Sequence, residues 1–231
     1  DRICAIGVIG VQKENHTSMY EIVNEGKKIS SKASSINHIT NEMLENKPKF
    51  KDTKAFALLQ EFNNEDSTLI AHNAGFDIKM LLASGFVWRG EVIDTLRVAK
   101  HLIPECSEFS LQFLRYDLKL YKNEKKEASK YLFKNMQQDF TAHNALFDAL
   151  HVKLLYDYLL EINPHSRLAE LSFKNVLIEK FDFGKYSGRY IEEISMYDRG
   201  YLEWIIVNIT DLDKDRRAHV ELQSRGHLVC R

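Results

Sequence analysis

The chain has 231 residues, enough to bury one domain of ordinary size and a small additional module. Its 33 acidic and 32 basic residues give a net charge of −1, so bulk charge indicates no nucleic-acid partner, and any such contact must come from local patches or metal ions. No apolar run is long enough to span a bilayer, and the first residues do not indicate a signal peptide. The three scattered cysteines suit a reducing compartment, so we expect a cytoplasmic protein without a membrane partner.

The first half of the chain predicts strands interleaved with helices. Two apolar runs within residues 3–23 flank a polar segment, which indicates an antiparallel hairpin. Two short helices, interrupted near Pro48, are expected over residues 40–62. A short strand at 68–71 leads through Asn73 and Gly75 into a helix, and a strand at 92–93 leads into another. This alternation favours an α/β layer structure.

The second half predicts a helix over 111–118 and a long helix over 145–160 that ends at a turn containing Pro164. Between them, residues 119–134 hold six lysines against two glutamates. We expect an exposed helix face there, and the alternative is a patch that attracts phosphates. The aromatic and glycine-rich segment over 173–224 predicts a separate module. We therefore expect a main domain over 1–163, a linker over 164–175 and a small C-terminal module over 176–225.

Two short motifs carry residues that could perform chemistry. They are His72-Asn73-Ala74-Gly75-Phe76-Asp77 and His143-Asn144-Ala145-Leu146-Phe147-Asp148. Each aspartate is expected in the first turn of a helix, where capping alone would explain a carboxylate. His143 by itself would be an ordinary loop histidine.

Taken together, the motifs match a known kind of chemistry. Phosphodiester cleavage by two metal ions needs several carboxylates around hard cations, for which oxygen ligands suit Mg²⁺ or Mn²⁺. A neutral imidazole beside the attacking water can accept its proton near neutral pH. His143 is the candidate for that base.

The residues resemble a family at this point. Asn73-x-x-Phe76-Asp77 is similar to the second motif of the DEDDh (DnaQ-like) 3′–5′ exonucleases, and His143-x-Ala145-x-x-Asp148 is similar to their third. The segment 35–40 resembles the family's I-H-x-I-T segment, with Asn37 where histidine is usual, and Asp94-Thr95 resembles its D-T segment, for which we expect a structural role. The resemblance implies an RNase H-like fold, a mixed central sheet flanked by helices.

The resemblance continues into the C-terminal segment. Phe183-Gly184-Lys185-Tyr186-x-Gly188-Arg189, followed by Tyr201-Leu202-x-Trp204-Ile205, resembles the C-terminal part of the exodeoxyribonuclease X group. The motif does not say what the segment does. Its four cationic side chains could contact phosphates or only keep the module in solution, and both readings stay open: Lys185, Arg189, Arg216 and Arg217.

The resemblance implies a metal-dependent exonuclease that removes nucleoside 5′-monophosphates from DNA 3′ ends. Asp77 and Asp148 would bind two divalent ions, Mg²⁺ or Mn²⁺, with His143 as general base, while Asn73 and Phe76 would surround the terminal nucleotide. We expect single-stranded DNA ends as the partner. Two alternatives stay open: an RNA exonuclease of the ribonuclease T or oligoribonuclease type, and a nucleic-acid-binding module without catalysis.

The first motif of this family, D-x-E, occurs nowhere in the 231 residues. Two carboxylates alone leave a two-metal site short of protein ligands, which weakens ion binding and placement. We therefore expect the natural gene to encode a short strand carrying D-x-E immediately upstream of Asp1, and the 231 residues alone to be inactive.

Overall fold

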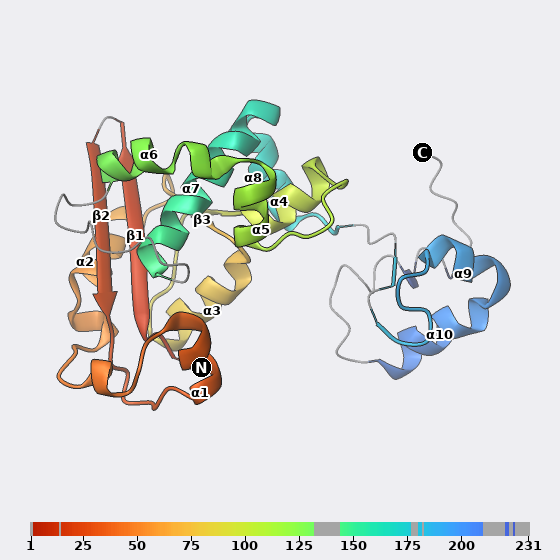
Figure 1. Ribbon diagram of the computed structural model, residues 1–231, viewed down its shortest axis with the longest axis horizontal. Helices are drawn as coiled ribbons and strands as arrows, with labels where there is room; N and C mark the ends of the chain where they lie inside the picture. The colour runs from red at the N-terminus through yellow and green to blue at the C-terminus, as the bar shows by residue number, and fades with distance from the viewer. Residues whose placement is uncertain are drawn as a thin grey trace. The chain divides into compact units, whose positions relative to one another are not determined.

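A computed structural model describes residues 2–13, 15–131, 144–176, 180–181, 183–209, 220–221 and 224 (Figure 1). The chain divides into two compact units, Asp1–Ser172 and Phe173–Arg231. Each unit has hydrophobic core residues of its own. All four described strands belong to the larger unit.

The strands form two pairs. β1 (Ala5–Gln12) and β2 (Asn15–Ile22) make the expected antiparallel hairpin, with Gly7 opposite Tyr20. β3 (Thr68–Ala71) runs parallel to β4 (Glu91–Asp94), and the helix between them provides the crossover that parallel strands need. The predicted hairpin and the two later strands are therefore confirmed.

Helices follow the strands in the order that the sequence predicts. Several begin at a side chain whose oxygen accepts a hydrogen bond from the first turn, such as Thr53, Ser110 and Asn144. In the larger unit the α-helices are α1 (Ser31–Asn37), α2 (Lys54–Phe62), α3 (Ala74–Ala83), α4 (Thr95–Leu102), α5 (Leu111–Asp117), α6 (Glu124–Tyr131), α7 (Ala145–Ile162) and α8 (His165–Phe173). Three short 3₁₀ segments are η1 (Glu42–Leu44), η2 (Phe50–Asp52) and η3 (Leu120–Lys122).

The strands separate two hydrophobic layers. Ile6 and Val8 of β1 pack with the cluster that holds Phe50 of η2 and Met80 of α3. Ile9, next along β1, packs on the opposite cluster, which is centred on α4, α5, α7 and α8. Successive side chains of a strand point to opposite faces, so this alternation puts helices on both sides of the strands. None of the described helices is long and apolar enough to cross a bilayer.

Two α-helices of the larger unit were not predicted. α1 begins at Ser30, whose Oγ accepts a hydrogen bond from the Ala33 N–H, but the helix buries no side chain, so it has no apolar periodicity to detect. α8 occupies most of the segment 164–175 that we expected as a linker. Its Leu168 and Leu171 belong to the core of the larger unit, and the division between units falls after Ser172.

The smaller unit is built on α9 (Ile191–Tyr197) and α10 (Arg199–Asn208) around a core that includes Ile194 and Leu202. Its glycine-rich motif forms the turn that leads into α9. Gly184 has a φ of +70°, and an added Cβ would lie 2.3 Å from the hydroxyl of Tyr201 on α10, so the motif and the helix are in close contact. The two segments that resemble the exodeoxyribonuclease X group, 183–189 and 201–205, are thus in contact with each other.

α7 lies directly against β1. At Gly7 an added Cβ would be 2.2 Å from the carbonyl carbon of Ala145 and 2.3 Å from the nitrogen of Leu146, both in the first turn of α7. Real Cβ atoms do not approach backbone so closely, so the strand and the helix can meet here only because residue 7 lacks a side chain. This contact determines how near the first turn of α7 comes to the hairpin.

We predict that Gly7→Ala lowers the free energy of unfolding by about 1 to 3 kcal/mol, because the added methyl group must displace the first turn of α7. Gly75→Ala is the matched control, since an added Cβ there meets no atom within 4 Å. That variant should unfold with unchanged or slightly higher free energy, by up to about 1 kcal/mol, because alanine favours helix. Urea denaturation measures both, and equal effects of the two substitutions would contradict the prediction.

Candidate active site

The two sequence motifs occupy equivalent places in the fold. Asp77 is the fourth residue of α3 and Asp148 is the fourth residue of α7, and each helix is preceded by an asparagine. The side chain of Asn144 caps α7 by accepting a hydrogen bond from the Leu146 N–H at 3.1 Å. Asn73 instead adopts the left-handed conformation, with φ 67°, and its side chain makes no capping hydrogen bond. The capping groups are thus not the aspartates of the motifs.

Asp94 takes the capping role at α3. Its carboxylate accepts hydrogen bonds from the N–H groups of Asn73 at 3.0 Å and Ala74 at 3.1 Å. The same carboxylate caps α4 by accepting from the N–H groups of Leu96 and Arg97. It is almost fully buried, and four N–H donors replace its lost solvation. The structural role expected of Asp94 is therefore confirmed.

Asp77 is the carboxyl group that these contacts leave without a counter-ion. It is half-buried, and burial followed by the negative charge of Asp94 raises its pKa from 3.8 to about 6. Among the described residues it has no ion-pair partner. A half-buried carboxylate next to a second carboxylate is stabilised by a cation, so the electrostatics of this position favour metal binding.

The phenylalanines of the two motifs differ in the same way as the asparagines. Phe76, beside Asp77, has 55% of its surface exposed, whereas Phe147, beside Asp148, has 2% exposed. Phe147 belongs to the core against α4 and α5. An exposed aromatic ring beside an uncompensated carboxylate is suited to contact a planar ligand, which supports Phe76 and not Phe147 as a contact residue.

Asp148 lies near a buried ionic network that the sequence did not reveal. Arg115 of α5 is attracted electrostatically to Asp148, and its guanidinium binds both carboxylate oxygens of Glu124 on α6. Burial and the charge of Arg115 lower the pKa of His151, one turn after Asp148, to about 4, so its ring is neutral at pH 7. Its Nε2 lies 3.2 Å from a carboxylate oxygen of Glu124, which can only accept, so Nε2 donates. The only available sequence signal is position, since His151 follows Asp148 by three residues and so lies on the same helix face.

His72 has a structural role. Its Nε2 lies 2.8 Å from the carbonyl oxygen of Phe109, to which it must donate, and its Nδ1 lies 3.1 Å from the hydroxyl of Thr95. Burial lowers its pKa, which favours the neutral form, and the Thr95 hydroxyl beside Nδ1 also donates to the Ala71 carbonyl oxygen at 3.2 Å. This histidine therefore joins β3, α4 and the segment before α5, with both ring nitrogens occupied.

His143, the expected base, lies outside the described residues, as do Arg216 and Arg217. Asp77 interacts electrostatically with Asp94, and Asp148 interacts electrostatically with Arg115. The convergence of residues 77, 143 and 148 on one metal site stays a prediction. Among the described residues, no group of three or more His, Cys, Asp or Glu side chains is arranged to hold a metal ion.

Other residues named from the sequence have identifiable contacts. Asn37 donates from its side chain to the Cys4 sulfur and accepts from the Ile39 N–H, so it organises the turn after α1. In the smaller unit Lys185 pairs with Asp198, and Arg189 pairs with Glu193. These pairs favour the structural reading of the two cations, because an acidic side chain already neutralises each of them.

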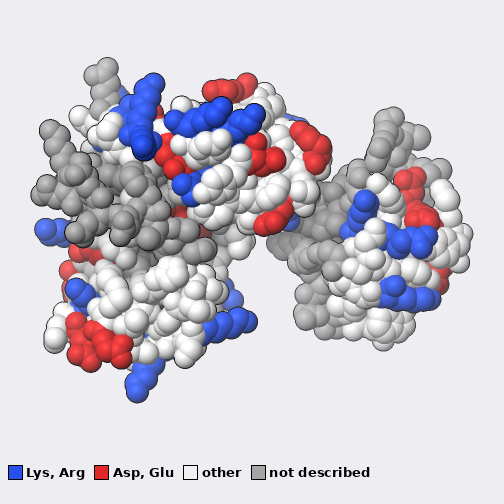
Figure 2. Space-filling model, viewed as in Figure 1, with Lys and Arg blue, Asp and Glu red and all other residues white. Residues whose placement is uncertain are grey.

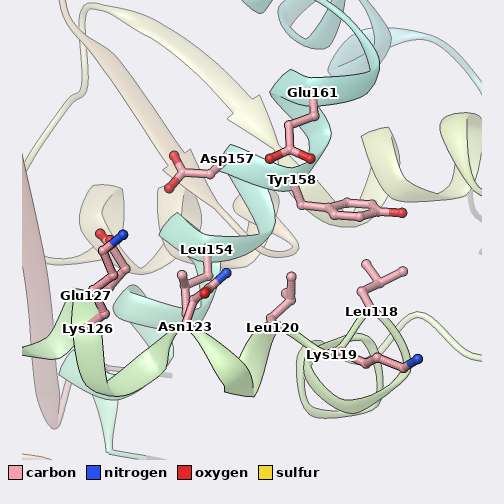
Figure 3. Close-up of a pocket in the computed structure, with 10 residues that line it drawn as sticks. All are labelled: Leu118, Lys119, Leu120, Asn123, Lys126, Glu127, Leu154, Asp157, Tyr158 and Glu161. Atoms are coloured by element: carbon pink, nitrogen blue, oxygen red, sulfur yellow. The ribbon is translucent and has the colours of Figure 1, made fainter.

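A pocket of about 280 Å³ lies between η3 with α6 and the C-terminal half of α7 (Figure 3). Asp157 and Glu161 come from α7, while Lys119 and Lys126 come from the opposite side. The described site residues Asn73, Phe76, Asp77 and Asp148 do not line it. The pocket is therefore separate from the two motifs, and its mixed charges do not favour a polyanion.

The chain matches two known sequence families. The family described as exonuclease matches residues 1–156, and the one described as exodeoxyribonuclease X-like C-terminal matches residues 181–210. The chain belongs to this exonuclease family. It is a DnaQ-like 3′–5′ exonuclease by class, so the family and enzyme class predicted from the two motifs are confirmed.

Individual relatives agree with this assignment. The chain is 27% identical to exodeoxyribonuclease 10 of Escherichia coli (strain K12) over 202 residues, which cover 86% of this chain and 81% of that protein. It is 37% identical over 111 residues to the DNA polymerase III PolC-type protein of Thermotoga maritima, covering 45% of this chain and 8% of that protein. The first relative is a nuclease of similar length, and the second is a much longer polymerase of which the chain matches a small part.

A solved structure shows the fold. Exonuclease X in complex with 5′ overhanging duplex DNA aligns with a TM-score of 0.56 and 23% identity, covering 74% of this chain and 90% of that one. The predicted RNase H-like α/β fold is therefore confirmed.

We predict that Asp94→Ala lowers the free energy of unfolding by about 2 to 4 kcal/mol, because the N–H groups of Asn73 and Ala74 lose a charged acceptor inside the protein. Asp94→Asn should cost less, since one carbonyl oxygen remains. Asp66→Ala, at an exposed position, is the control and should change stability by less than about 0.5 kcal/mol. Chemical denaturation at pH 7 measures all three. An Asp94→Ala protein with the free energy of unfolding of the wild type would refute the capping role.

We predict that Asp77→Asn stabilises the protein in the presence of a chelator. The pKa of Asp77 is about 6 in the folded state and 3.8 ordinarily, so the folded state binds the extra proton and its stability falls as pH rises from about 4 to about 6. Asparagine does not titrate and avoids this loss. The variant should therefore be more stable than the wild type at pH 7.5, by at most about 3 kcal/mol, and the gain should vanish at pH 4.

Urea denaturation at the two pH values measures this difference, with the exposed Asp66→Asn as the matched control. An Asp77→Asn protein less stable than the wild type at pH 7.5 would show that the carboxylate is already compensated.

Proposed function

We propose that the protein is a metal-dependent exonuclease that hydrolyses DNA from the 3′ end and releases nucleoside 5′-monophosphates. The observation that carries this proposal is Asp77, a half-buried carboxyl group beside Asp94, with a pKa raised to about 6 and no ion-pair partner among the described residues. Such a group at the start of α3 is suited to a cation. The exonuclease family supplies the reaction class.

The donor set is compatible with hard divalent cations. Asp77 and Asp148 offer carboxylate oxygens, the donors that Mg²⁺ and Mn²⁺ prefer, and we propose that they take part in holding two such ions. The bound ions would supply positive charge to the attacking and leaving oxygens of the phosphodiester. Arg115, which is paired with Glu124, also attracts the Asp148 carboxylate electrostatically.

The remaining roles belong to side chains around these carboxylates. His143 would accept the proton of the attacking water, since a neutral imidazole is available near pH 7. The exposed ring of Phe76 would contact the terminal base, and Asn73, exposed in the left-handed turn before α3, would contact its sugar or phosphate. Asp94 would act through Asn73, because it holds the backbone of that turn.

DNA is the proposed substrate because the relatives are named for it. Exodeoxyribonuclease 10 and the PolC-type polymerase act on DNA by name, and exonuclease X was solved with 5′ overhanging duplex DNA. We propose a single-stranded 3′ end as the substrate. We also propose that the enzyme acts in the cytoplasm, where its free thiols Cys4 and Cys106 would remain reduced.

We predict that full-length protein removes nucleotides from the 3′ end of a labelled single-stranded DNA with Mg²⁺ or Mn²⁺ and stops with chelator. His143→Ala should lower the rate at least about a hundredfold, the typical contribution of a general base. Asp148→Asn should lower it further and raise the metal concentration needed for half activity, because a ligand is removed. Single-turnover assays with quantified mononucleotide product measure these effects.

Asp157→Asn is the matched control, since it lies on the same helix as Asp148, nine residues further along, and should retain activity. A matched RNA of the same sequence tests the choice of sugar. Cleavage confined to RNA would overturn the DNA assignment, and cleavage that persists with chelator would overturn the metal dependence.

A further inference from the structure

An exposed aromatic pair lies at the end of α5. Tyr116 and Tyr121 have 59% and 41% of their surfaces exposed, and their ring centres are 5.7 Å apart with planes inclined by 37°. Large aromatic side chains gain by burial, and two adjacent exposed rings form a flat surface on which a planar group can stack. No described residue covers them in the way that the core covers Phe147.

The backbone after this pair presents lysines outward and acids inward. Glu124 and Glu127 of α6 are buried, where Arg115 neutralises the first and Lys130 and Lys153 neutralise the second. Lys122 and Lys125 are exposed, and neither forms an ion pair with any described residue. The acidic side chains of this segment are therefore buried and neutralised, while the lysines Lys122 and Lys125 face solvent. Figure 2 shows basic side chains gathered over α6 and the segment before it.

The aromatic pair and the two lysines belong to one short stretch of chain. Lys122 directly follows Tyr121 at the end of η3, and Lys125 lies in the first turn of α6, so four exposed side chains fall within residues 116–125. We define Tyr116, Tyr121, Lys122 and Lys125 as the Tyr–Lys surface. Lys126 is excluded because it lines the pocket of Figure 3, whose acidic side chains would repel phosphates.

This surface is connected to the proposed catalytic centre through one side chain. The Arg115 guanidinium lies 4.9 Å from the centre of the Tyr116 ring, binds Glu124 and is attracted to Asp148. A side chain in contact with Tyr116 therefore also interacts with a proposed metal ligand. In the smaller unit Lys185, Arg189 and Arg199 have acidic partners.

We propose that the Tyr–Lys surface binds the unpaired nucleic-acid strand on the 5′ side of the nucleotide being removed, by stacking bases on Tyr116 and Tyr121 and attracting phosphates to Lys122 and Lys125. This inference rests on the proposed function, because a 3′ terminal nucleotide held at the catalytic centre must be followed by chain on its 5′ side. Stacking requires exposed base faces, which a paired duplex hides, so the occupant is a single strand. An acidic peptide would match the lysines but has no reason to continue from the catalytic centre.

The test is binding of a fluorescent 20-nucleotide single-stranded DNA to the full-length protein in the presence of chelator, where no cleavage occurs. Tyr121→Ala should weaken binding roughly fivefold to a hundredfold, the effect of losing one stacked base. Tyr121→Leu should weaken it as much, since it keeps apolar surface without a flat ring. The Lys122→Ser/Lys125→Ser double variant should reduce the slope of log affinity against log salt by about 1.4.

Tyr197→Ala and the Lys51→Ser/Lys54→Ser double variant are matched controls, because these exposed side chains belong to other elements: Tyr197 to α9, Lys51 to η2 and Lys54 to α2. Thermal unfolding verifies that each variant is folded. If the Tyr121 variants bind with wild-type affinity, or the lysine variant keeps the wild-type salt slope, the proposal is overturned. A loss of affinity shared by the control variants would overturn it too.

Cleavage of a dinucleotide separates this proposal from the proposed function. A dinucleotide is too short to reach beyond the catalytic centre, so the Tyr–Lys variants should cleave it at the wild-type rate with metal present. Absence of dinucleotide and oligonucleotide cleavage in the wild type would refute the proposed function, while the binding result would still decide whether the Tyr–Lys surface holds a strand.

Discussion

The site depends on the carboxylate of Asp94. This group lies at the end of β4, where it accepts the N–H groups of the turn before α3 and of the first turn of α4. Its own N–H donates to Ser172 Oγ on α8, whose hydroxyl donates to the Leu168 carbonyl oxygen. Hydrogen bonds thus connect α3, α4 and α8 to one residue at the end of β4. The bonds to the turn before α3 help to set the direction in which α3 leaves β3.

The two aspartates near each other in this region have opposite environments. Asp94 has exchanged water for four backbone donors, so its charge is compensated by the fold. Asp77 is half-buried with, among the described residues, a hydrogen bond from its own N–H only, and the charge of Asp94 adds to the cost of ionising it. A fold selected only for stability would neutralise or expose Asp77. Its retention is understandable if the missing positive charge arrives with a ligand, which is how functional sites commonly depart from local optimisation.

The sequence predicted what depends on periodicity and short motifs. The hairpin, the strand–turn–helix containing Asp77 and the long helix containing Asp148 were all visible, because apolar alternation and turn residues mark them. It could not predict α1, which buries no side chain, or the packing of α8, whose sequence follows a proline turn and resembles a linker. It also missed the buried contacts of Arg115, Glu124 and His151, because partners distant in sequence are joined only by the tertiary structure. Asn73 and Asn144 occupy equivalent positions in the two motifs, and only the structure shows that Asn73 is left-handed while Asn144 is extended and caps its helix.

The contact at Gly7 has a mechanical consequence. Since the backbone of β1 touches the backbone of Ala145 and Leu146 with no side chain between them, no soft rotamer can absorb a displacement of either segment. The hairpin and the start of α7 should therefore move as one rigid body. The position of the Asp148 carboxylate, one turn further along, is then set by the stiffness of a two-stranded ribbon more than by any flexible side chain around it.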